Sequence, residues 1–160
     1  MNAILQAQNK QVELKKIKSH DDMSDETNCF SAEVWVDGKY LARVSNDGQG
    51  GSNNYDFDLT KDGGRWKEFS EWCKALPHDF EFEYEDQVID NLFQQWAEKE
   101  DERKSKAQLR RLCKTKTVFR LKGDPEGSWL TIKHPYDDCV KAHLKAKYGD
   151  KVEEVANERT

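Results

Sequence analysis

The sequence has 160 residues, of which 36% are hydrophobic, 36% are charged and 11% are aromatic. That length allows one domain or two small ones, and the aromatic content argues against a disordered chain. The formal net charge is −5, and no apolar run reaches the roughly 20 residues of a membrane span, so we expect no membrane contact. The first residues lack the basic and then apolar pattern of a secretion signal, which favours a cytoplasmic protein of a bacterium or an infected cell.

Charge is distributed unevenly along the sequence. Residues 1–102 carry 11 Lys/Arg and 23 Asp/Glu, whereas residues 103–147 carry 13 Lys/Arg and 4 Asp/Glu. A chain sorted in this way either presents surfaces of opposite sign to charged partners or neutralises itself internally.

The first elements that the pattern predicts are strands. Apolar and polar residues alternate within residues 11–20 and predict an edge strand, and residues 30–46 predict a β-hairpin. Asp37 and Gly38 supply the two positive φ angles of a tight type I′ turn. A two-residue turn sets these cross-strand pairs: Val36 with Lys39, Trp35 with Tyr40, and Val34 with Leu41.

Helices follow the predicted hairpin. Residues 55–59 predict a short third strand, and apolar residues at helical spacing predict a helix over 65–76. Residues 78–84 fit a short strand or an extended linker. The longest predicted helix covers 85–112, although its charged stretch 97–107 is either a solvated helix or a helix break.

The last third of the chain predicts a second small module. Residues 117–135 read as a hairpin, and residues 136–149 as a helix with Asp137 or Asp138 near its N-cap. Residues 150–160 predict a short terminal helix. We therefore expect an α+β protein in which an antiparallel sheet packs on helices, with a smaller C-terminal hairpin-plus-helix module. The expected divisions are a sheet-and-helix module 1–97, a charged helical connector 98–112 and the C-terminal module 113–160, unless the three form one continuous domain.

A loop rich in glycine and asparagine, residues 45–55, is the first candidate site. No helix or lysine follows it as in a phosphate-binding loop, and nearby aspartates repel phosphate. The loop is therefore either a wide connection between strands or a loop that contacts a partner or ligand. The residues that would make the contact are Asn46, Asp47, Gly48, Gly50, Gly51, Asn53 and Asn54.

A basic stretch with interleaved aromatic residues, 103–136, is the second candidate. Such a patch is typical of surfaces that bind single-stranded nucleic acid or nucleotides. The alternative is that this stretch docks on the acidic stretch 79–102 of the same chain. The basic-aromatic patch comprises Arg110, Arg111, Arg120, Lys122, Trp129 and Lys133.

A metal site is the third and weakest candidate. The four widely spaced cysteines are typical of free thiols in a cytosolic chain. Four residues nevertheless have spacings that suit zinc: Cys73, His78, Cys139 and His143. Clustered acids between residues 79 and 90 fit either bound magnesium or a solvated negative surface, so a metal-dependent hydrolase is an alternative function.

Several segments resemble a group of small uncharacterised proteins from phages and bacterial accessory genomes. The resemblance is carried by "VSNDGQGG", with "DGK" before it and "CKALP" after it, and by "FRLKGDPEGSW" and "KAHLKAKYGDKVEEVANER". It covers much of the chain and implies an accessory protein active in phage–host conflict, but no activity or catalytic residue.

The leading functional hypothesis is a non-enzymatic binding protein without a cofactor, acting on a host or phage macromolecule. A protein partner is favoured, and nucleic-acid or nucleotide binding through residues 103–136 is the first alternative.

Overall fold

The computed structural model describes residues 3–58, 60–61 and 63–159. The chain divides into two compact units, Met1–Glu98 (unit 1) and Lys99–Thr160 (unit 2). Antiparallel sheets occur together with helices, so the predicted α+β class is confirmed. None of the described helices combines the length and the apolar character that crossing a membrane requires.

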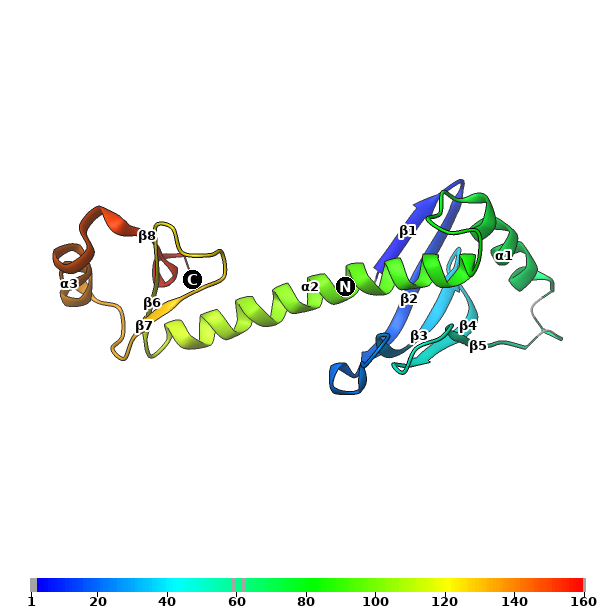
Figure 1. Ribbon diagram of the computed structural model, residues 1–160, viewed down its shortest axis with the longest axis horizontal. Coiled ribbons are helices and arrows are strands. Elements are labelled where there is room, and N and C mark those ends of the chain that lie inside the picture. The colour runs from blue at the N-terminus through cyan, green and yellow to red at the C-terminus, as the bar shows by residue number, and fades with distance from the viewer. Residues whose placement is uncertain (1–2, 59, 62, 160) are drawn as a thin grey trace. The chain divides into compact units, whose positions relative to one another are not determined.

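Unit 1 contains a five-stranded antiparallel sheet in the order β1-β2-β3-β4-β5 (Figure 1). Its strands are β1 (Ala3–Ala7), β2 (Lys10–Ser19), β3 (Cys29–Val36), β4 (Lys39–Asp47) and β5 (Asn54–Asp56). The prediction that residues 11–20 form an edge strand is wrong, because β2 lies between β1 and β3. Alternation of apolar and polar residues reports only that one face is covered, and it does not distinguish an edge strand from a central one.

The β3–β4 hairpin has the predicted turn but not the whole predicted register. Asp37 and Gly38 have φ angles of 51° and 79°, as a type I′ turn requires. Val34 pairs with Ala42 rather than with Leu41, because a β-bulge follows the second pair from the turn. Both Leu41 and Ala42 are consequently buried.

The chain after β4 follows the predicted order with shorter strands. β5 ends at Asp56, before Phe57, and Leu59, where the predicted strand ends, lies outside the described residues. Phe57 instead stacks on Trp66 of helix α1 (Arg65–Ala75), with ring centroids 4.4 Å apart. Residues 77–83 contain no strand and connect α1 to α2.

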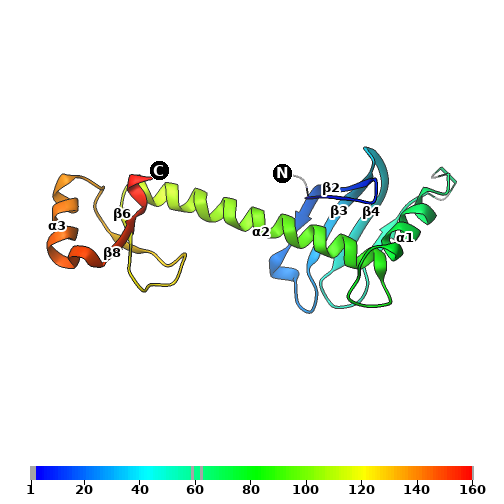
Figure 2. The ribbon, with the colours of Figure 1, turned by 90° about the horizontal axis from the view of Figure 1, so that it is seen from above.

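Helix α2 (Tyr84–Cys113) is continuous through the charged stretch. In unit 1, α1 and the first half of α2 lie against one face of the sheet (Figures 1 and 2). Phe69 and Ile89 are fully buried there, and Phe93 stacks on Phe30 of β3 at 4.3 Å between ring centroids. This packing forms the main hydrophobic core.

Unit 2 contains a three-stranded antiparallel sheet in the order β7-β6-β8 and the helix α3 (Asp138–Tyr148). The strands are β6 (Thr117–Leu121), β7 (Leu130–Ile132) and β8 (Val152–Val155). The predicted hairpin is present as β6 and β7, and Asp137 caps α3 by accepting a hydrogen bond from the Val140 N–H at 2.9 Å. The predicted terminal helix is wrong: residues 152–155 pair with β6, between two 3₁₀ turns, Gly149–Lys151 and Ala156–Glu158.

Candidate functional site

A tight hairpin fixes the first strand of unit 1 on its neighbour. Gln8 and Asn9 connect β1 to β2 with φ angles of 48° and 65°, the positive values of a type I′ turn. Ala7 pairs with Lys10 directly beside this turn. In such a two-residue hairpin the closing pair exchanges both of its backbone hydrogen bonds.

The outer edge of β1 therefore carries free backbone groups. Because hydrogen-bonded pairs alternate along an antiparallel ladder, Leu5 and Ala7 direct their N–H and C=O groups towards β2. Ile4 and Gln6 direct theirs outward. No further strand lies beyond β1 among the described residues, and an unpaired edge of this kind is a template for pairing with another strand.

A groove of about 680 Å³ runs beside this edge, and we call it the β1 groove. Its lining combines apolar side chains from β1, from α2 and from the end of α1 and the residues after it with a row of amides on α2. The apolar members are Leu5, Ala7, Leu76, Pro77 and Val88, together with the Cys73 thiol, and the amides are Gln87, Asn91 and Gln94. His78, Asp79 and Tyr84 complete the lining. An apolar floor with a few polar groups is typical of sites that bind peptides or small molecules.

Two contacts explain why the groove forms at this place. The indole N–H of Trp72 donates to the Ala7 carbonyl at 3.3 Å, which brings the end of α1 to the end of β1. Phe93 stacks on Phe30 and so draws α2 over β3 rather than over β1. The space between α2 and β1 is then left open to a further segment.

An exposed aromatic pair lies on the loop that leads from the groove into α2. Phe80 and Phe82 are 56% and 58% exposed, and their rings stack with centroids 5.5 Å apart. Gln87 holds this loop, because its side-chain amide donates to the carbonyls of Phe80 and Phe82 at 3.1 and 2.8 Å and accepts from the Asp79 N–H. Large aromatic side chains presented on a fixed loop are typical anchors of protein interfaces.

The proposed zinc residues are divided between the two units. Cys73 and His78 belong to unit 1, and Cys139 and His143 belong to unit 2. Burial raises the pKa of the Cys73 thiol to about 12, so without a bound metal ion it stays protonated at neutral pH and is a poor nucleophile. No cluster of three or more His, Cys, Asp or Glu side chains suited to a metal occurs in the described part of the chain.

The glycine-rich loop is braced from within the protein. The Gly48 carbonyl accepts hydrogen bonds from three successive backbone N–H groups at residues 25–27, at 2.9 to 3.2 Å. The Asn46 side-chain oxygen accepts from the Thr27 hydroxyl at 2.7 Å and from the Gly48 N–H at 2.9 Å, and its amide donates to the Asn53 side-chain oxygen at 3.0 Å. Among the seven predicted contact residues, Asn46, Gly48 and Asn53 are therefore buried structural members.

The remaining members of the loop face solvent or are partly covered. Asp47, Gly51 and Asn54 are exposed, and Gly50 is half-buried. The role of this loop in partner contact stays a prediction that concerns these residues.

Asp86 of α2 connects the loop to the helix. Its two carboxylate oxygens accept from the Asn53 N–H at 2.9 Å and from the Tyr55 hydroxyl at 2.6 Å, and the Asn53 amide also donates to Asp90 at 2.8 Å. Burial raises the pKa of Asp86, although both hydrogen bonds act in the opposite direction. The pKa of Asp90 is also raised, by burial and by the charges of Asp86 and Glu83.

The basic-aromatic patch does not form a uniform surface within unit 2. Arg120 pairs with Glu154 at 3.3 Å and is half-buried, and Arg159 lies over the Trp129 ring at 5.4 Å from its centroid. The other predicted members, Arg110, Arg111, Lys122 and Lys133, are exposed.

Sequence reasoning missed β1 and therefore the groove beside it. The signal was weak: Ala3–Ala7 alternates over only five residues, and its turn residues Gln8 and Asn9 do not include glycine. Groove formation depends in addition on where two helices pack, which periodicity does not specify.

Comparison with protein-family models, with curated proteins and with solved structures finds no match to this chain.

Proposed function

We propose that this chain is a non-enzymatic binding protein that holds an extended segment of a partner protein at the outer edge of β1. The observation that carries the proposal is the free edge at Ile4 and Gln6 beside a groove with an apolar floor. A segment added to this edge would form main-chain hydrogen bonds with β1, and alternate side chains would enter the groove.

The groove and its surroundings define the chemistry of the segment. Leu5, Leu76 and Val88 favour small or medium apolar side chains on the inward face. Residues 79–86 contain five acidic and no basic residues, and unit 1 as a whole carries 10 Lys/Arg and 20 Asp/Glu. The segment should therefore carry lysine or arginine next to its apolar residues, because complementary charge favours encounter with this unit. The exposed rings of Phe80 and Phe82 would add an aromatic anchor beyond the end of the groove.

The biological setting of the proposal comes from the sequence. The resemblance to phage and accessory-genome proteins implies a partner from the host or from a phage. This resemblance suggests where to look for a partner, and the groove suggests what chemistry the partner should offer.

Peptides selected from a random linear peptide library on the full chain should bind through β1. We expect Gln6→Pro to weaken their binding about 10-fold or more, because proline removes the outward N–H donor. The variant should fold, since proline is tolerated on an edge strand where the N–H faces solvent. Gln6→Thr keeps the donor and should bind like the wild type. Isothermal titration calorimetry with the same peptide compares all three proteins.

A second pair of variants tests the groove. Asn91→Trp places a large side chain in the groove and should block the peptide, whereas Glu71→Trp introduces the same side chain at an exposed position of α1 that does not line it. Selected peptides that bind Gln6→Pro and Asn91→Trp as tightly as the wild type would refute the proposal. A library that yields no peptide specific for the chain would also refute it.

A further inference from the structure

We propose that the second half of α2, in unit 2, binds the phosphate backbone of double-stranded nucleic acid. We call the surface the basic stripe. It comprises Arg103, Lys104, Lys106, Arg110 and Arg111 of α2, together with Lys114 and Lys116 directly after the helix. The basic stripe shares no residue with the β1 groove, so the inference does not depend on the function proposed above.

The basic stripe has more positive charge than its neighbours neutralise. Residues 103–116 contain seven Lys/Arg and no Asp/Glu. Arg103 and Lys106 pair with Glu100 and Glu102 at 2.5 and 2.6 Å. The others form no ion pair with a described residue.

Four members of the stripe are both exposed and without such a pair: Lys104, Arg110, Arg111 and Lys114. Lys106 and Arg110 lie four residues apart within α2, and like charges at that spacing destabilise a helix. An anionic partner would relieve this repulsion.

The composition of α2 distinguishes among anionic partners. Between Arg103 and Lys116 the apolar side chains are Ala107, Leu109, Leu112 and Cys113, too few for a broad apolar face. A helix that lies on a membrane surface needs a broad apolar face in addition to its basic face. The stripe is therefore suited to a solvated polyanion rather than to an anionic lipid surface.

The aromatic residues of unit 2 distinguish duplex from single-stranded nucleic acid. Proteins that bind single strands stack bases on free aromatic rings. Arg159 lies over the Trp129 ring, and the Tyr136 hydroxyl donates to Glu158 at 2.5 Å. With both aromatic side chains engaged inside unit 2, the stripe offers cations alone, which bind backbone phosphates without reading the sequence.

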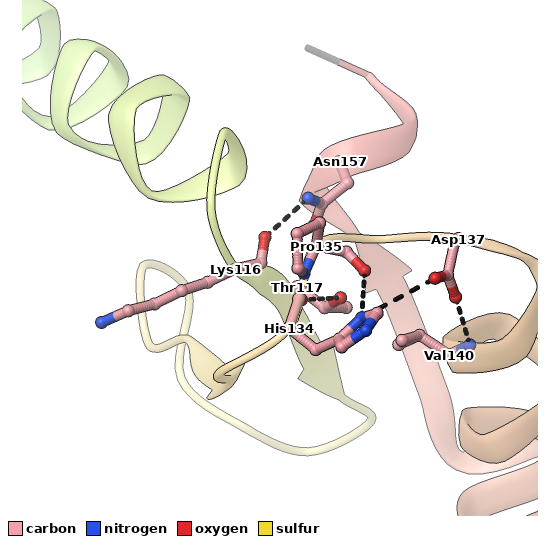
Figure 3. A network of polar contacts seen from close by, with 7 residues as sticks. All are labelled: Lys116, Thr117, His134, Pro135, Asp137, Val140 and Asn157. Carbon is pink, nitrogen blue, oxygen red and sulfur yellow. Dashed lines mark hydrogen bonds and ion pairs between the residues drawn. The ribbon is translucent and has the colours of Figure 1, made fainter.

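Asn157 fixes the end of the stripe on the body of unit 2 (Figure 3). Its side-chain amide donates to the carbonyls of Cys113 and Lys116 at 3.1 and 2.9 Å, and its oxygen accepts from the Val118 N–H at 2.8 Å. These bonds join the last turn of α2 to β6. The backbone at the end of the stripe is thereby held in place before any ligand binds, which lowers the entropic cost of binding.

Fluorescence anisotropy with a labelled DNA duplex of about 20 base pairs tests this proposal, because non-specific backbone binding weakens steeply with salt. The triple variant Arg110→Gln, Arg111→Gln, Lys114→Gln should bind about 10-fold or more weakly at low salt. The magnitude of its slope of log affinity against log salt should decrease by about 2 to 3, because each phosphate contact contributes nearly one to that slope. Lys141→Gln, Lys145→Gln, Lys147→Gln on α3 makes the same charge change and should stay within about 2-fold of the wild type.

Several results would overturn the assignment. The first is that the chain does not bind the duplex at low salt. The second is that both triple variants lose equal affinity, and the third is that a single strand of the same length binds with equal affinity. Binding of polyglutamate as tight as that of the duplex would instead indicate an acidic protein partner. Circular dichroism checks that both triple variants fold. If the α2 triple variant does not fold, the single variant Arg111→Gln replaces it, and its slope of log affinity against log salt should be reduced by about one.

Discussion

Replacing Asp86 with alanine should lower the free energy of unfolding of unit 1 by about 3 kcal/mol, because it leaves two buried donors without an acceptor. These donors are the Asn53 N–H and the Tyr55 hydroxyl, each now bonded to one carboxylate oxygen. Asp86→Asn keeps one acceptor oxygen and should lose about 1 kcal/mol. Urea denaturation followed by tryptophan fluorescence measures the change, since four of the five tryptophans lie in residues 1–98. A loss below about 0.5 kcal/mol for the alanine variant, the size typical of a surface change, would contradict this role.

The pH dependence gives an independent readout of the same carboxyl group. Its pKa is raised in the folded protein, so the folded state binds the proton more tightly than the unfolded state. The resulting stabilisation is fully present below the unfolded pKa of about 4 and is lost as pH rises through the folded pKa. The wild type should therefore gain stability relative to Asp86→Asn as pH falls from 7 to about 4. A difference that does not change with pH would contradict the raised pKa.

Replacing Gly48 with alanine should cost about 3 kcal/mol, from left-handed backbone strain and from overpacking together. Gly48 has φ of +81°, and an added Cβ would lie 2.4 Å from the Met23 carbonyl oxygen and 2.9 Å from the Cys29 Cβ. Neither neighbour is the flexible end of a side chain, so the loop itself must move. The same denaturation measurement reports the loss.

Gly51 provides the matched control in the same loop. Its φ is +93°, but no described atom lies within 4 Å of an added Cβ. Gly51→Ala should therefore cost only the backbone strain, about 1 kcal/mol. Equal losses at the two glycines would show that the close approach at Gly48 has no energetic effect.

Local chemistry made much of the fold predictable from the sequence. The Asp37-Gly38 turn and the apolar spacing of α1 and α2 are local signals, and each element forms as expected. The Asp137 cap of α3 is another signal of this kind.

The errors arise where long-range packing decides. The bulge beside Leu41 buries two consecutive residues, which strict alternation cannot represent. Residues 152–155 pair with β6, a partner 31 to 36 positions away in the chain, and their short charged sequence has no strong strand pattern.

The site was less predictable than the fold for a related reason. The composition of the glycine-rich loop predicts a contact site, but Asn46 and Asn53 form their hydrogen bonds within the protein. The β1 groove is lined by residues from 5 to 94, and no single segment contains its signature.

Amide hydrogen exchange along β1 shows whether its outer edge is free to bind a partner. We expect Ile4 and Gln6 to exchange about 10-fold or more faster than Leu5 and Ala7 in the free chain, because only the latter two donate to β2. Addition of a selected peptide should then slow Ile4 and Gln6 to the rates of their neighbours. Equal protection of all four amides in the free chain, or no slowing at saturating peptide, would contradict the assignment of β1 as the binding edge.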